Sequence, residues 1–180
     1  RWGAGEARWV RPLHRILCLL DREVVPLSFA ELEADRTTEG HRFMAGEPFP
    51  VARPVEYEDM LLSARVLADP AARRQRIEDG AERLADHAGL RLRDDPGLID
   101  ELAGLTEWPV PLLGRIDEAF MALPPEVLAT SMRSHQKYLA LEDEAGRLAP
   151  RFVVVANLEA DDGGAAILAG NERVLRARLW

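Results

Sequence analysis

Side chains suited to binding chemistry stand together at four consecutive positions, His135, Gln136, Lys137 and Tyr138. They offer several hydrogen-bond donors, one positive charge and one aromatic face, a combination that suits contact with the end of an RNA chain or with a peptide. The structural alternative is a helix that ends here and leads into a strand in which Tyr138 packs inward. The residues favour neither interpretation.

A second polar group lies near the C-terminal end of the sequence and comprises Asn171, Glu172, Arg173, Arg176 and Arg178. In a helix, Glu172 and Arg173 share a face with Arg176, because they precede it by four and three residues. Paired guanidinium groups on such a face can bind phosphate or dock a neighbouring domain. The simpler alternative is that arginines near the end of a helix complement its dipole. Because the helical pattern still runs at Trp180, we expect the helix to continue in a longer chain, and we favour docking.

Two other segments carry candidate contact residues. In the loop around Gly40, His41 and Arg42 can donate hydrogen bonds to phosphate, although the favoured interpretation is that they tie the loop to a sheet. Asn157 stands at the polar end of an apolar, strand-like run that begins at Pro150. Near the N-terminus, Trp2 and Trp9 lie among arginines and could stack on RNA. We favour the interpretation that these two rings cover the edge of a sheet.

The sequence gives little support for an independent catalytic, cofactor or metal site. The four histidines are not spaced as metal ligands, and the single cysteine, Cys18, lies in an apolar run that is typical of a buried thiol. The glycine-rich phosphate loops and the nucleophile elbow are absent from the sequence. We therefore expect no cofactor in this chain.

Composition predicts a soluble globular protein with only local capacity for nucleic acid. The 180 residues are 47% apolar and carry a formal net charge of −8, which argues against a strong, nonspecific nucleic-acid binder. No apolar stretch approaches the roughly 20 residues that span a bilayer. One cysteine cannot form an internal disulfide, which fits a reducing compartment. We expect a cytoplasmic protein without membrane contact.

The pattern of elements predicts an α+β fold. Apolar runs on either side of Asp21-Arg22 predict a hairpin, and residues 137–142 and 152–158 predict a second hairpin around a turn at 143–146. Between them, residues 31–50 are predicted to be mostly loop, and residues 108–113 an extended segment that is not a central strand. Helices are expected after Arg53-Pro54, Asp69-Pro70, Asp95-Pro96 and Pro124-Pro125, with a last helix from about residue 165. The result is a mainly antiparallel sheet from hairpins near both ends, with a helical block between.

Eight motifs in order resemble the β subunit of the bacterial tetrameric glycyl-tRNA synthetase, and together they extend over essentially the whole chain. They are Arg1-Trp2-Gly3, Trp9 to His14, Gly40 to Phe43, Glu107-Trp108-Pro109, Leu123 to Leu128, His135 to Tyr138, Asn157 with Glu159, and Gly170 to Leu179. The chain departs from the family pattern at Glu39, where a basic residue is frequent, at Leu139, where an aromatic residue is usual, and at Trp180. A glutamate at position 39 weakens phosphate binding by that loop.

The resemblance implies an enzyme of two α and two β subunits that charges tRNA with glycine, using ATP and magnesium bound by the α subunit. It implies that residues 1–180 are a single α+β fragment of the β subunit, with a B3/B4-like module. The implied partners are the α subunit, glycine tRNA and the remainder of the β subunit. The expected role is non-catalytic, in tRNA recognition or in scaffolding between domains and subunits.

Two alternatives stay open beside that role. A hydrolytic editing domain would require His41 or His135 to meet a positioned water and an acidic partner in one pocket, and the small size of glycine reduces the need for editing. A pure scaffold would show Arg173, Arg176 and Arg178 paired to carboxylates.

Overall fold

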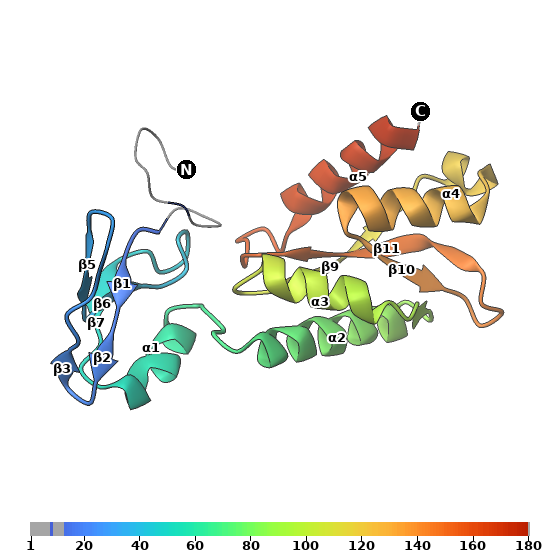
Figure 1. The fold of residues 1–180 in the computed structure, drawn as a ribbon. Helices are drawn as coiled ribbons and strands as arrows, with labels where there is room; N and C mark the ends of the chain where they lie inside the picture. The colour runs from blue at the N-terminus through green and yellow to red at the C-terminus, as the bar shows by residue number, and fades with distance from the viewer. Residues whose placement is uncertain (1–7, 9–12, 180) are drawn as a thin grey trace. The chain divides into compact units, whose positions relative to one another are not determined.

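The computed structural model describes residues 8 and 13–179 and divides the chain into two compact units, residues 1–66 and residues 67–180 (Figure 1). The sequence led us to treat residues 1–180 as one fragment. The α+β class is confirmed, because both units combine helices with small, mostly antiparallel sheets. The motifs at residues 1–3 and 9–12, including Trp2 and Trp9, lie outside the described residues, as does Trp180.

The first unit contains the predicted N-terminal hairpin. Strands β2 (Leu19–Leu20) and β3 (Glu23–Val24) pair antiparallel around a turn in which Asp21 has a φ of 54°. Strand β1 (Ile16–Leu17) pairs in parallel with β5 (Leu32–Asp35), which also pairs antiparallel with β4 (Ser28–Phe29). The helix predicted after Arg53-Pro54 is present as a 3₁₀ turn, Pro54–Glu56, followed by α1 (Tyr57–Ser63).

The prediction that residues 31–50 are mostly loop is wrong. This segment contains β5 and a hairpin of β6 (Thr37–Glu39) with β7 (Pro48–Pro50). In β5 the half-buried residues alternate with exposed acidic residues, the period of a strand with one covered face. The prolines of β7 are compatible with a strand that pairs along one side only. The sequence prediction gave these prolines and acidic residues too much weight as loop signals.

The second unit is built on a four-stranded antiparallel sheet in the order β8-β10-β11-β9 (Figure 1). The strands are β8 (Arg91–Leu92), β10 (Leu139–Glu142), β11 (Leu148–Ala156) and β9 (Val110–Arg115). The hairpin of β10 and β11 confirms the second predicted hairpin. Strand β9 occupies the sheet edge, where Pro111 pairs with Val155, so the extended and non-central character predicted for this segment is confirmed.

Two capped helices cover one face of this sheet. Helix α2 (Pro70–His87) begins at Asp69, whose side chain accepts the Ala71 N–H at 2.9 Å, and Gly89 follows its end with a φ of +67°. Helix α3 (Pro96–Leu105) begins at Asp95. Their apolar faces meet the sheet in a core that includes Ile77, Leu98, Leu102, Leu139, Leu141 and Val153. The predicted starts of both helices are confirmed. They could be predicted because the residues that cap a helix lie next to it in the sequence.

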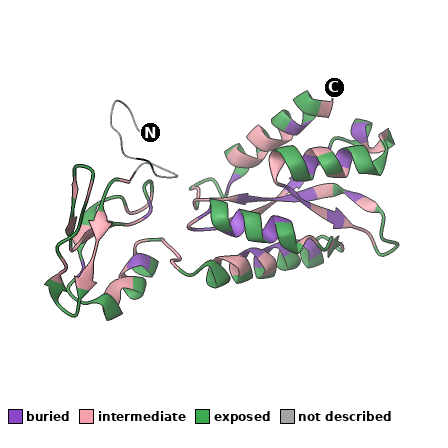
Figure 2. Ribbon diagram, in the orientation of Figure 1, coloured by how far each residue is buried: buried purple, intermediate pink, exposed green. Residues whose placement is uncertain are grey.

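The other face of the sheet is covered by α4 (Pro125–Thr130), the helical turn Ser131–Gln136 and α5 (Ala165–Leu179). A short 3₁₀ helix, Glu118–Ala122, leads into α4. Phe152 and Tyr138 form the centre of this second core, and Leu128, Met132 and Leu175 pack around them. Buried residues therefore concentrate on both faces of the sheet and on the helix sides that meet it (Figure 2).

The strands of the two predicted hairpins belong to different sheets. Strands β2 and β3 are two residues long, and Leu20 at their turn is 69% exposed, so they offer no continuous apolar face to a larger sheet. None of the helices in the described part of the chain combines the length and apolar character needed to cross a bilayer.

Candidate functional site

The His-Gln-Lys-Tyr segment lies where a widened helical turn meets the central sheet. Residues Ser131–Gln136 form a π-helical turn, and Lys137 takes the left-handed conformation with φ 59° and ψ 39°. The Tyr138 N–H then donates to the Met132 carbonyl at 3.1 Å, which closes the turn before β10 begins. Such π turns are rare in proteins as a whole, but those that occur often lie at functional sites.

Tyr138 points into the core. Its side chain is buried, its ring stacks on Phe152 with centroids 4.4 Å apart, and its hydroxyl donates to Asn171 Oδ1 at 2.7 Å. Burial raises the pKa of Tyr138 to about 12, and the positive charge of Arg178 acts in the opposite direction. The phenol therefore remains a hydrogen-bond donor at neutral pH and joins the turn to α5. A base cannot stack on a ring in this position.

The other residues of the segment divide between the protein and solvent. Lys137 Nζ lies 2.9 Å from Glu101 Oε1 on α3, and the half-buried Gln136 places its Oε1 3.4 Å from the Tyr138 hydroxyl. His135 is exposed, and its side chain makes no hydrogen bond or ion pair within residues 13–179. Within this one segment, Tyr138 thus packs inward, as the structural alternative required, while His135 stays exposed, as binding would require.

A pocket of about 290 Å³ opens beside this turn, between α3, β10 and the π turn. Asp95 and Arg133 line it, and Arg133 Nε donates to Asp95 Oδ2 at 2.5 Å. A larger pocket of about 650 Å³ shares Arg93 and Thr130 with the first. Hydroxyl and guanidinium groups in these walls are able to hydrogen-bond to phosphate or ribose oxygens. Sequence spacing gave no signal for this pocket, because Asp95 and Arg133 lie 38 positions apart.

Replacing Asp95 with alanine is expected to lower the free energy of unfolding by about 1 kcal/mol at neutral pH, because α3 loses its N-cap. The Arg133 guanidinium, and to a lesser extent the Leu98 N–H, hold the pKa of Asp95 below its ordinary value of 3.8. A depressed folded-state pKa means that this stabilisation is complete above the unfolded value and is lost as the pH falls through the folded one. Urea unfolding at pH 7 and near pH 2.5 should show the difference between the proteins shrink in acid, and an equal difference at both pH values would contradict this origin.

Helix α5 holds most of its predicted contact residues against the protein. Asn171 donates from Nδ2 to the Ile167 carbonyl at 2.8 Å while its Oδ1 accepts from Tyr138. Glu172 Oε1 accepts the Arg115 N–H at 2.9 Å at the outer edge of β9. Arg176 forms an exposed ion pair with Asp117 at 3.2 Å.

Two arginines of α5 face solvent. Arg173 and Arg178 are exposed, and their side chains make no hydrogen bond or ion pair in the part of the chain that the structure describes. The expectation for a pure scaffold, in which all three arginines are paired, is met by Arg176 alone.

Asn157 and Glu159 fasten the Glu107-Trp108 segment to the end of β11. Asn157 Oδ1 accepts the N–H groups of Glu107 at 2.7 Å and Trp108 at 3.0 Å. Glu159 Oε1 accepts the indole N–H of Trp108 at 2.9 Å, and the Arg76 guanidinium lies 4.1 Å above the indole ring. Their side-chain oxygens are thus engaged within the unit.

The glycine-containing loop of the first unit buries its histidine. The His41 side chain is buried, its backbone N–H donates to the Ala64 carbonyl at 2.8 Å, and its Nδ1 accepts the Phe43 N–H at 3.3 Å. Arg42 and Phe43 are exposed, with the guanidinium 5.6 Å from the ring centroid. His41 therefore holds the loop to the end of α1 and not to a sheet, and Arg42 does not take part in this attachment. His41 and His135 belong to different units.

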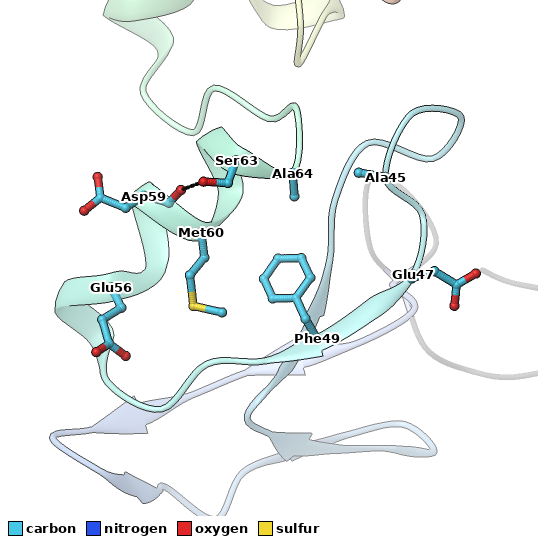
Figure 3. Close-up of a pocket in the computed structure, with 8 residues that line it drawn as sticks. All are labelled: Ala45, Glu47, Phe49, Glu56, Asp59, Met60, Ser63 and Ala64. Atoms are coloured by element: carbon cyan, nitrogen blue, oxygen red, sulfur yellow. Dashed lines mark hydrogen bonds between the residues drawn. The ribbon is translucent and has the colours of Figure 1, made fainter.

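The first unit also has a pocket that the sequence did not indicate. It measures about 570 Å³, and Phe49 and Met60 face each other across it, with Glu47, Glu56 and Asp59 at its margin (Figure 3). Across the described residues of both units, no three His, Cys, Asp or Glu side chains converge as a metal site requires.

These features define an α+β protein in which each unit carries candidate contact residues with outward-facing basic groups. Comparison with known proteins gives the family. The family described as "Glycyl-tRNA synthetase beta subunit" matches residues 1–180. The chain is 50% identical to the glycine–tRNA ligase β subunit of Rhodospirillum centenum over 99% of its length, and 51% and 47% identical to those of Phenylobacterium zucineum and Acidobacterium capsulatum. The chain belongs to this family.

The chain spans about a quarter of the length of these relatives: 28% of the first, 27% of the second and 26% of the third. The same three comparisons align 98% to 99% of this chain's residues.

Proposed function

We propose that this chain is a non-catalytic part of a glycine–tRNA ligase β subunit that contacts glycine tRNA through outward-facing basic residues. Its relatives are named β subunits of that ligase. The observation that carries the proposal is the division of the motif residues into two sets. Tyr138, Asn157, Asn171 and Glu172 are engaged inside the second unit.

The second set faces solvent and comprises Arg42, His135, Arg173 and Arg178. Cations and hydrogen-bond donors of this kind contact the phosphate and sugar of a nucleic acid without reading its sequence. The net charge of −8 means that such contacts are local, because the rest of the surface repels RNA.

A scaffolding role has its own support. Lys137 is paired with Glu101, and Arg176 with Asp117, so these two cations stabilise the second unit and are partly neutralised. In this second candidate function, the chain places other parts of the β subunit and the α subunit without touching RNA.

The partners that we propose are the α subunit, the remainder of the β subunit and glycine tRNA, in the cytoplasm. ATP and Mg²⁺ are assigned to the α subunit, as the family resemblance implies. The described residues offer Mg²⁺ no converging set of three acidic or histidine ligands.

The test is a titration of the 180-residue chain against labelled glycine tRNA and one unrelated tRNA at two salt concentrations. We expect salt-sensitive binding, and we expect the double variant R173Q/R178Q to bind about tenfold more weakly at low salt, because it loses contacts to phosphate. Each lost contact is also expected to lower the slope of log affinity against log salt concentration by about one unit. Binding of both tRNAs with equal affinity would assign the contacts to the phosphate backbone alone.

The matched control is R147Q. Arg147 is also an exposed arginine, but it is paired with Asp143 in the β10–β11 turn. R147Q removes one positive charge, as each of the single variants R173Q and R178Q does, so these two are measured beside the double variant. We expect the control to bind tRNA as the unaltered chain does. Absence of binding by the unaltered chain would exclude the RNA contact and leave the scaffold as the function.

A further inference from the structure

Two arginines lie directly opposite each other where β9 ends beside the middle part of β11. Arg115 on β9 is in register with Arg151 on β11. The next pair along is hydrogen-bonded, since the Ile116 N–H donates to the Pro150 carbonyl at 3.0 Å, and the Arg115 N–H points away from β11 to Glu172. Hydrogen-bonded and non-hydrogen-bonded pairs alternate in antiparallel strands, so Arg115 and Arg151 form a non-hydrogen-bonded pair. In such pairs the Cα atoms are about 4.5 Å apart and the side chains are closest.

Both arginine side chains leave the sheet on the face covered by α2 and α3. Phe152, next to Arg151, belongs to the opposite core with Tyr138 and Leu175. Ala149 and Val153, two positions from Arg151 on either side, belong to the core with α2 and α3. Because side chains alternate along a strand, Arg151 shares the α2 and α3 face, and so does its partner Arg115. Arg115 is exposed and Arg151 is half-buried.

Neither guanidinium has a partner in the described part of the chain. No hydrogen bond or ion pair joins the side chain of Arg115 or Arg151 to residues 8 and 13–179. Six other arginines of the second unit are engaged, Arg73 and Arg76 with backbone carbonyls and Arg74, Arg133, Arg147 and Arg176 with carboxylates, whereas Arg173 and Arg178 on α5 are not engaged by any described residue. The sequence has 31 acidic against 23 basic residues, so carboxylates are not scarce.

Like charges directly opposite on neighbouring strands are destabilising. A bound anion reverses the sign of that interaction, because two guanidinium forks are able to donate to one phosphate at the same time. The backbones of both arginines are held in place, which keeps the pair ready for such an anion. Glu172 accepts the Arg115 N–H, and the strand pairing holds Arg151.

We infer that Arg115 and Arg151 form a phosphate-binding pair whose ligand is a phosphodiester of the RNA backbone. This inference rests on the proposed function, and it adds a contact on the sheet face opposite the one that α5 covers. A pair of this kind grips the backbone and carries no base specificity.

The test measures binding of labelled glycine tRNA to the 180-residue chain across a range of salt concentrations, for the unaltered chain, R115Q, R151Q, R115Q/R151Q and the control R147Q. Glutamine keeps part of the side-chain length and hydrogen bonding but removes the charge. We expect the double variant to bind about tenfold more weakly at low salt and to lose about one unit of the salt slope, with R147Q unchanged.

Thermal unfolding without RNA provides the second readout. Removal of one or both of the repelling charges is expected to leave the melting temperature unchanged or to raise it. Weaker tRNA binding by a variant that melts in this way cannot be attributed to unfolding. Tight binding by the unaltered chain with an unchanged affinity and slope in R115Q/R151Q would overturn the phosphate pair and leave the proposed function intact. Absence of binding by the unaltered chain would overturn both.

Discussion

Replacing Phe152 with alanine is expected to lower the free energy of unfolding by about 3–5 kcal/mol, the cost of truncating a fully buried aromatic side chain. Phe152 is 0% exposed, and its ring stacks on Tyr138 with 4.4 Å between the centroids. Gly114 on β9 makes room for this ring, because a Cβ there would lie 2.4 Å from Phe152 Cζ. Equilibrium unfolding in urea, followed by tryptophan fluorescence and by circular dichroism, gives the free energy.

Two variants separate this packing effect from a general loss of apolar area. Phe152→Leu keeps most of the volume and is expected to cost less than the alanine variant. Val127→Ala on α4 removes apolar atoms from a side chain that is 50% exposed, and it is expected to change stability by less than about 0.5 kcal/mol. A loss below 1 kcal/mol for Phe152→Ala would mean that this second core does not hold the unit together.

The parts of the fold that sequence predicted correctly are those with local causes. Asp69 and Asp95 each precede a proline and cap the helix that follows, so the local sequence alone marks the start of α2 and α3. The β10–β11 hairpin is likewise local, since its turn at 143–146 joins two apolar runs. Strand β5 was missed because only four residues carry its alternation.

The candidate site was predicted less well, because its contacts join distant positions. Tyr138 meets Asn171 across 33 positions, and Asn157 meets Glu107 across 50. A motif shows which side chains stand together in sequence, but it does not show whether a hydroxyl or an amide is turned inward. Seven of the predicted contact residues are engaged within the second unit, namely Gln136, Lys137, Tyr138, Asn157, Asn171, Glu172 and Arg176. The Arg115–Arg151 pair, by contrast, belongs to none of the eight motifs.

Replacing Asn157 with alanine is expected to lower the free energy of unfolding by about 2–4 kcal/mol. One oxygen of this amide accepts two backbone N–H groups, those of Glu107 and Trp108, and both would lose their acceptor in the variant. Each unsatisfied buried donor costs about 1–3 kcal/mol, and water can reach this half-buried site in part, which lowers the sum. Urea unfolding measures the loss.

Asn157→Asp is the matched control, because a carboxylate keeps the acceptor for both N–H groups and is expected to lose less stability than alanine does. The same variants also decide between the two interpretations of Asn157. A side chain that holds the Glu107-Trp108 segment changes stability and leaves the salt dependence of tRNA binding unchanged, once binding is measured where the variant is folded. A stable Asn157→Ala protein with weakened tRNA binding would restore Asn157 as an RNA contact, since its amide would then be needed by the ligand more than by the fold.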